Sequence, residues 1–310
     1  MSDYAFFHKQ FMPLSEARIG VLTHALHYGT ACFEGVRGNW DSKERRFCIF
    51  RLQDHYKRML GGCRMLRITL PYSIDKLCQL TGELVERSGY REDVYIRPLA
   101  YKSSEALGVR LHNLEDDFLI IVTTLPPYLD AENGVRSCVS SWRRVDDTMI
   151  QPRGKICGIY ANSALAKTEA CENGFDEAIL LTQDGHVSEG SGENIFLVIG
   201  GRLITPPPSD NILMGVTRDS VMTLAKNELG IDTIERQVDR SELYVAEECF
   251  FTGTAANVAP ILEIDHRPIG NGEIGKVTAK LQKLFAEVMV GRNRKYPEWY
   301  YLVSPKTVKV

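Results

Sequence analysis

Apolar residues recur along this chain in two rhythms, one of three to four residues and one of two. The longer rhythm predicts amphipathic helices, because residues at that spacing share one helical face. It occurs at residues 52–66, 73–88, 159–173, 215–230 and 274–290. Gly89, Gly174 and Gly230 stand where such helices end. In the third segment, the expected inward residues are Ala161, Ala164, Leu165 and Thr168.

Shorter runs rich in β-branched and aromatic residues predict strands. They are residues 46–51, 93–101, 118–125, 135–141, 177–182, 186–189, 193–199, 202–205, 248–252 and 257–264. Because helices and strands are interspersed through the whole chain, the predicted fold class is α+β or mixed α/β.

A proline pair followed by a polar, glycine-ended stretch predicts a linker between two domains. We therefore expect a small N-terminal domain at residues 1–125, a linker at 126–134 and a larger C-terminal domain at 135–310. A length of 310 residues is compatible with two modest domains. A ligand bound between two domains is a common arrangement.

Composition narrows the class of protein. The net charge of -3 gives no reason to expect nucleic acid or an acidic membrane surface as partner. The eight cysteines include no C-x-x-C pair, so no metal site is expected and buried thiols in a reducing compartment are favoured. The first thirty residues lack a secretory pattern, and the apolar run at residues 118–122 is too short to span a bilayer. The expected location is the cytoplasm.

A candidate reaction centre surrounds Lys155. This lysine follows Gly154, and Glu189 stands in a glycine-rich turn further along the chain. Two stretches then carry anion-binding signals: residues 215–218 open a helix, and residues 252–256 end a strand. An amine, a carboxylate and two anion-binding turns are what pyridoxal phosphate requires for its aldehyde, its ring nitrogen and its phosphate.

The strand predicted at residues 93–101 carries a second candidate. Its alternation puts Tyr95 and Arg97 on one face. A guanidinium beside a phenol could bind a carboxylate. Alternatively, these residues form the polar face of an edge strand, since Pro98 favours an edge or a bulge.

The order of these motifs resembles the branched-chain amino acid aminotransferases, members of fold type IV of the pyridoxal-phosphate enzymes. The resemblance covers residues 17–301 and includes segments 27–37, 51–59, 95–98, 153–160 and 187–193. It implies a two-domain fold like that of D-amino acid aminotransferase. It also implies transfer of an amino group between L-leucine, L-isoleucine or L-valine and 2-oxoglutarate, in two half-reactions.

The resemblance also implies residue roles. Lys155 would bond to the cofactor and move a proton at the substrate's α-carbon, and Arg97 would bind the distal carboxylate of glutamate. The cofactor-binding residues would be Arg58, Lys155, Tyr160, Glu189, Val216, Thr217 and Thr254. The substrate-binding residues would be Tyr28, Phe33, Tyr95, Arg97, Leu107, Val109, Thr254 and Ala255.

The implied partners are small amino acids and 2-oxo acids, with a second copy of the chain. Residues 107–109 and Tyr28 match a segment that reaches the neighbouring subunit's site in the family. A homodimer is therefore the smallest competent unit expected, and a trimer of dimers is left open.

Three alternatives remain at this point. A transaminase of the same fold would act on D-amino acids or (R)-amines, or a lyase on aminodeoxychorismate. A dinucleotide-dependent oxidoreductase has only residues 190–192 in its favour, which lack the third glycine and do not precede a helix. A pyridoxal-phosphate-binding protein without activity would keep the phosphate cradle and could lose the pocket residues.

Overall fold

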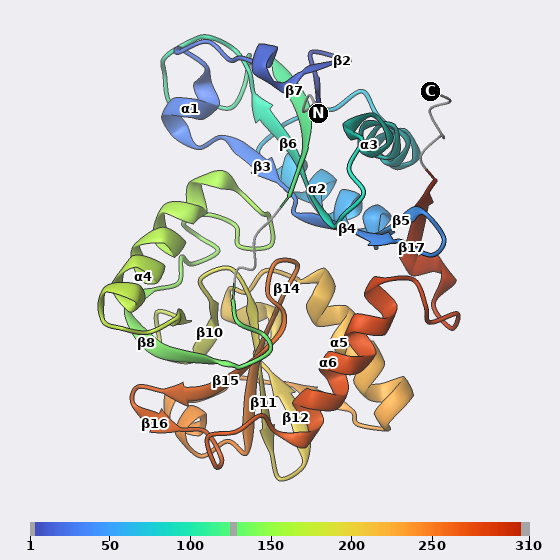
Figure 1. The fold of residues 1–310 in the computed structure, drawn as a ribbon. Coiled ribbons are helices and arrows are strands. Elements are labelled where there is room, and N and C mark those ends of the chain that lie inside the picture. Colours follow the sequence, from blue (N-terminus) through green and yellow to red (C-terminus); the bar gives the residue numbers. More distant parts are fainter. Residues whose placement is uncertain (1–3, 125–128, 305–310) are drawn as a thin grey trace. The chain divides into compact units, whose positions relative to one another are not determined.

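The computed structural model describes residues 4–124 and 129–304. The chain forms two compact units, each with its own sheet and helices (Figure 1). The first comprises Met1–Pro126, Gly154–Gly158 and Glu287–Val310, and the second comprises Pro127–Arg153 and Ile159–Ala286. Residues 126–128 of the expected linker lie outside the described residues.

The first unit is built on an antiparallel sheet that has eight strands within the described residues. Their order is β17-β5-β4-β6-β7-β1-β2, and β3 also pairs with β6. The strands are β1 (Tyr4–Phe7), β2 (Gln10–Pro13), β3 (Ala31–Phe33), β4 (Val36–Asp41), β5 (Arg46–Phe50), β6 (Val94–Lys102), β7 (Asp116–Thr123) and β17 (Tyr300–Val303). The helices are α1 (His24–Tyr28), α2 (Leu52–Met65) and α3 (Ile74–Ser88), with short 3-10 turns at Leu14–Glu16 and Pro297–Trp299.

Helix α3 has the end signals that its sequence predicts. Ser73 Oγ accepts a hydrogen bond from the amide of Lys76 at 3.2 Å, and Gly89 ends the helix with φ +72°. Leu77 and Leu84 on its inner face have no exposed surface. The helix is therefore held by its caps and by its apolar stripe.

The second unit is built on a mixed sheet that has nine strands within the described residues, in the order β10-β9-β8-β15-β14-β11-β12-β13, with β16 on β15. They are β8 (Val135–Arg143), β9 (Glu177–Leu181), β10 (Val187–Gly190), β11 (Asn194–Ile199), β12 (Arg202–Thr205), β13 (Thr233–Glu235), β14 (Glu248–Gly253), β15 (Asn257–Ile264) and β16 (Arg267–Pro268). The helices are α4 (Tyr160–Glu172), α5 (Val216–Leu229) and α6 (Lys276–Met289), with 3-10 turns at Cys157–Ile159, Pro208–Asp210 and Arg240–Tyr244.

Helix α4 buries a different face from the one predicted. Ala161, Ala164, Leu165 and Thr168 are all exposed, whereas Ser163, Ala166 and Ala170 are buried. The buried alanines pack in one cluster with residues of β8 and β9. Small side chains allow this close approach to the sheet, so size rather than hydrophobicity selects the buried face.

Two segments belong to the first unit although the sequence placed them in the C-terminal domain. Residues 154–158 attach to β3: the Phe33 amide donates to the Lys155 carbonyl at 3.0 Å, and Cys32 forms a β-bridge with Ile156. The C-terminal segment adds β17 to the sheet by pairing with β5. Both attachments are backbone hydrogen bonds between distant parts of the chain, which periodicity does not reveal.

Candidate active site

Lys155 lies half-buried on the short segment that is held to the first unit. Its Nζ is 5.1 Å from the centroid of the Phe33 ring. The segment is fixed again where the Gly158 amide donates to the Gly29 carbonyl at 3.2 Å. Gly29 has φ +64°, and an added Cβ would lie 2.8 Å from the Gly158 Cα, so both the backbone angle and the close approach require glycine. The lysine thus projects from a clamped backbone.

Arg58 is held by a buried carboxylate. Its Nε and Nη2 donate to the two oxygens of Glu34 at 2.8 and 2.6 Å, and His55 Nδ1 lies 2.8 Å from Glu34 Oε2. Burial alone would raise the pKa of Glu34, but the Arg58 guanidinium, helped by His55, lowers it to about 2. Burial in turn lowers the pKa of His55. The paired side chains fix the orientation of the Arg58 guanidinium.

Arg97 and Tyr95 come together on β6 as predicted. Arg97 Nη2 donates to the Tyr95 hydroxyl at 2.7 Å, and its guanidinium lies 4.3 Å from the centroid of Phe33. Arg97 Nε is buried without a hydrogen-bond partner. Gly35 makes room for this pair, because an added Cβ would lie 2.2 Å from the Tyr95 hydroxyl. The group presents a cation beside an aromatic face.

The position of Pro98 does not make β6 an edge strand, which corrects one of the sequence interpretations. β6 pairs with β7 on one side and with β4 and β3 on the other. Pro98 lies between the stretches paired with β4 and β3, and its carbonyl accepts from the Glu34 amide at 2.9 Å. The partner strand is interrupted at that point, so the missing N–H of proline breaks no ladder bond there.

Tyr28 is joined to the loop that contains Leu107 and Val109. Its hydroxyl accepts from the Gly108 amide at 3.0 Å, and His24 Nε2 is 3.0 Å from the Gly108 carbonyl. The side chains of Leu107 and Val109 are 65% and 92% exposed. This loop therefore presents apolar side chains on the surface of the first unit.

In the second unit, Glu189 on β10 is surrounded by donors. Arg144 Nη2 lies 2.7 Å from its Oε1, and Asn194 Nδ2 and the Leu213 amide donate to its Oε2 at 2.9 and 3.0 Å. The register of β10 on β9 shifts between Val187 and Glu189, which reorients the side chain. A carboxylate is acceptor-only when ionised, so this set of donors satisfies its anionic form.

Helix α5 starts close to Glu189. Its N-cap is Gly215, which has no side chain to bond the first amides of the helix. Val216 and Thr217 at the first turn are buried. The amides of a first helical turn lack acceptors within the helix and therefore favour an anion, and the dipole adds to this preference.

Three other predicted residues lie in the second unit. Tyr160 is the first residue of α4 and is half-buried. Thr254 and Ala255 lie half-buried in the turn that joins β14 to β15. A turn of this kind at the end of a strand can present backbone amides to an anion, as the sequence predicts here.

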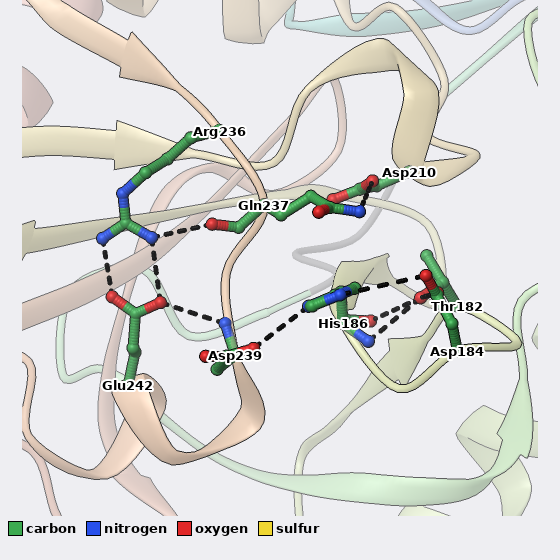
Figure 2. Close-up of polar contacts among 8 residues, drawn as sticks. All are labelled: Thr182, Asp184, His186, Asp210, Arg236, Gln237, Asp239 and Glu242. Carbon is green, nitrogen blue, oxygen red and sulfur yellow. Dashed lines mark hydrogen bonds and ion pairs between the residues drawn. The ribbon is translucent and has the colours of Figure 1, made fainter.

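The start of β10 is held by a second polar network, which Figure 2 shows. His186 Nδ1 lies 3.1 Å from Asp239 Oδ1, and Gln237 Nε2 donates to Asp210 Oδ1 at 3.4 Å. Ser188 Oγ also donates to the Asp210 carbonyl at 2.6 Å. Burial raises the pKa of the Asp210 carboxyl. The Ser188–Asp210 bond fastens the segment that leads toward α5 to the strand that carries Glu189.

The comparisons with known proteins agree with one another. A family model described as "Amino-transferase class IV" matches residues 31–264. The chain belongs to the class IV aminotransferase family. It is 48% identical to a "Probable branched-chain-amino-acid aminotransferase" of Aquifex aeolicus, over 98% of each chain.

Solved structures show the same class IV fold. A branched-chain aminotransferase from Thermoproteus uzoniensis with norvaline gives a TM-score of 0.93 at 39% identity, over 97% of this chain and 99% of that one. The T.th. branched-chain amino acid aminotransferase complexed with N-(5'-phosphopyridoxyl)-L-glutamate gives 0.91 at 39% identity, over 97% and 98%. The predicted resemblance and the mixed fold of helices and sheets are confirmed.

The predicted site residues divide between the two compact units of the chain. The first unit brings together Lys155, Phe33, Tyr95 and Arg97, and it also carries Arg58, Tyr28, Leu107 and Val109. The second unit carries Tyr160, Glu189, Val216, Thr217, Thr254 and Ala255.

Sequence reasoning missed the residues that orient these groups: Glu34, His55, Arg144 and Asn194. Only His55 had a signal, since its three-residue spacing from Arg58 puts both on one side of α2. Within residues 4–124 and 129–304, no group of three or more His, Cys, Asp or Glu could hold a metal ion, and no helix is long and apolar enough to cross a membrane.

Proposed function

We propose that this class IV aminotransferase binds pyridoxal 5'-phosphate and transfers the amino group between L-branched-chain amino acids and 2-oxoglutarate. The observation that carries the substrate choice is Arg97 stacked on Phe33. An aromatic face suits a leucine side chain, and a guanidinium suits the second carboxylate of glutamate. The relatives named as branched-chain aminotransferases, and the relative complexed with a phosphopyridoxyl-glutamate, support the same choice.

The residues of both units suit the cofactor chemically. In the second unit, Glu189 is held as an acceptor for a protonated ring nitrogen, and the α5 start lacks a side-chain cap. Val216, Thr217 and Thr254, with Arg58, would hold the phosphate, and Tyr160 would donate to the ring's phenolic oxygen. Bound pyridoxal 5'-phosphate supplies an electron sink for the charge that develops when the substrate loses its α-proton.

Lys155 carries the proton transfer in this proposal. Its Nζ would hold the cofactor between turnovers and, once the substrate's amino group has displaced it, would take the proton from the substrate's α-carbon. Tyr95, Thr254 and Ala255 would hold the α-carboxylate so that the bond to that proton faces the amine. Two half-reactions follow, because the donor leaves as a 2-oxo acid before 2-oxoglutarate enters.

A homodimer is part of the proposal. The exposed apolar residues of the first unit include Ile19, Val21, Leu22, Leu26, Tyr28, Leu107 and Val109. They are connected through the contacts of Gly108 with His24 and Tyr28 and through the Thr23–Glu105 bridge. Such a patch favours an interface with a second copy, where Leu107 and Val109 would reach the neighbouring site. A trimer of dimers is left open.

The test follows the visible spectrum of the protein loaded with pyridoxal 5'-phosphate. We expect L-leucine to bleach the band of the lysine-bound cofactor and 2-oxoglutarate to restore it, whereas D-alanine and an (R)-amine leave it unchanged. The substituted protein Lys155→Ala should bind the cofactor without that band and should not sustain multiple turnovers. Lys43→Ala, which removes an exposed lysine, is the matched control.

Each other outcome changes one part of the proposal. Bleaching by D-alanine or the (R)-amine in place of L-leucine would replace the substrate assignment by one of the same-fold alternatives. Sustained turnover by Lys155→Ala at the wild-type rate would contradict the assignment of Lys155 as the residue that transfers the proton. Absence of this band from the visible spectrum of the wild-type protein would contradict the assignment of pyridoxal 5'-phosphate as cofactor.

A further inference from the structure

Asn194, the first residue of β11, uses both hydrogens of its side-chain amide. Nδ2 donates to Glu189 Oε2 at 2.9 Å and to the Leu213 carbonyl at 2.8 Å. The Leu213 amide donates to the same Glu189 oxygen at 3.0 Å. Asn194 is 4% exposed, so these bonds form away from solvent. Glu189, Asn194 and Leu213 therefore make a closed ring of hydrogen bonds.

The oxygen of the same amide lies against the N-cap of α5. A Cβ added to Gly215 would lie 2.0 Å from Asn194 Oδ1. Gly215 has φ -68° and ψ 132°, angles that any residue adopts. Backbone conformation therefore does not require glycine here, whereas the space taken by the Asn194 amide does. The glycine marks a close approach of the side chain to the helix start.

Arg144 fastens the same loop from the other side of the carboxylate. Its Nη2 is 2.7 Å from Glu189 Oε1, and its Nε donates to the Asn211 carbonyl at 3.3 Å. Asn211 Nδ2 also donates to Asp146 Oδ2 at 3.1 Å. The loop from Asn211 to Gly215 is thus tied to the side chains around Glu189 at several points. Its free movement relative to the carboxylate is restricted.

We infer that Asn194 is a positioning residue that fixes the distance between the Glu189 carboxylate and the start of α5. The inference rests on the proposed function, in which these two groups hold the ring nitrogen and the phosphate of one cofactor. That cofactor is a rigid ring with a short phosphate arm, so both anchors act together only at one spacing. Asn194 touches both anchors and is the side chain that sets this spacing.

The test measures dissociation constants of the apoprotein for pyridoxal 5'-phosphate, pyridoxal and inorganic phosphate, together with the thermal midpoint of the apoprotein. We expect Asn194→Ala to weaken the binding of pyridoxal 5'-phosphate about 10- to 100-fold, by analogy with the range seen when side chains that orient metal ligands are removed. Inorganic phosphate would contact only the start of α5, so its dissociation constant should change less than about threefold. Asn271→Ala, on an exposed turn, is the matched control.

A double substitution separates positioning from general damage. Gly215→Ala alone should weaken the binding of pyridoxal 5'-phosphate, because the added methyl group displaces the Asn194 amide. In the Asn194→Ala protein the methyl group of Ala at position 215 has room. Gly215→Ala should therefore cost less affinity for pyridoxal 5'-phosphate in that background than in the wild type. Should Asn194→Ala fail to fold, Asn194→Leu keeps a similar volume while losing both donors without adding a charge, and a loss of cofactor affinity of the same order is expected.

Three results would overturn the inference. One is wild-type affinity for pyridoxal 5'-phosphate in Asn194→Ala and Asn194→Leu. Another is an equal weakening of the binding of pyridoxal 5'-phosphate and of inorganic phosphate. The third is that the losses of affinity simply add in the double substitution. Failure of the proposed function is distinguishable, because the wild-type apoprotein itself would then not bind pyridoxal 5'-phosphate.

Discussion

Glu34 is fully buried and still ionised at neutral pH because two partners compensate for its burial. The Arg58 guanidinium and the His55 ring hold its pKa at about 2, against an ordinary value of 4.5. The pKa of the folded state is lower than that of the unfolded chain. Its share of the stability is therefore complete above about pH 4.5 and is lost as the pH falls toward 2. The lowered pKa of His55 acts in the same direction.

Substitution of Glu34 by Gln should destabilise the protein at neutral pH by about 3 kcal/mol, since it removes the counter-charge of the largely buried Arg58. The free energy of unfolding, measured in urea between pH 7 and pH 3, should also fall less steeply with acid than in the wild type. Glu83→Gln, which removes an exposed ion pair with Arg87, is the control. A pH profile parallel to the wild type would contradict the ionised state of Glu34.

At the scale of residues, the sequence indicated the candidate reactive groups and missed the side chains that the structure places against them. Lys155 and Glu189 stand in glycine-flanked motifs, and Arg97 shares a strand face with Tyr95, so spacing or local motif points to them. Arg144 and Asn194 reach Glu189 only after β8, β10 and β11 have been arranged in one sheet. Such contacts depend on tertiary structure, which a linear pattern does not contain.

Helix α3 is the element whose ends depend most clearly on single residues. Ser73→Ala removes the acceptor for the Lys76 amide, and we expect a loss of about 1 kcal/mol in the free energy of unfolding. Ser73→Asp should restore most of it, because a carboxylate also caps and favours the positive end of the helix dipole. Urea unfolding at neutral pH gives the comparison. Equal stability of Ser73→Ala and the wild type would show that the cap does not limit α3.

The elements that the sequence located are those with a strong periodic pattern or an end signal. α3 has both, and the hairpin of β11 and β12 is joined by Gly200 and Gly201 as its turn dipeptide predicts. The face of α4 was wrong because its alanines give little contrast between sides. β1 to β3 were not found because each has only three or four residues, and β3 and β4 overlap the motif at residues 27–37. β1 pairs with β7, β2 with β1, and β3 and β4 with β6, and this pairing supplies the order that their own residues do not indicate.

For the whole molecule, the apolar patch of the first unit leads to a prediction about assembly. The wild-type protein should sediment as a dimer at least, and Val109→Glu should shift it toward the monomer, because a charge buried in an interface is costly. Val109 is 92% exposed, so the substitution should leave folding of the chain intact. Val245→Glu, at a 73% exposed position of the second unit, is the control. A dimer unchanged by Val109→Glu would exclude this patch as the interface.

The path of the chain through its two units limits how the protein can be divided. The chain passes from one unit to the other at residues 126, 153, 158 and 286, and the five residues between the second and third passages contain Lys155. A fragment that stops at residue 126 has Phe33 and Arg97 but lacks Lys155, whereas one that starts at residue 127 carries Lys155 away from the strand that clamps its backbone. Neither half is a transferable module, so recombination or splitting of the gene at the apparent domain boundary would separate Lys155 from the strand that holds its backbone.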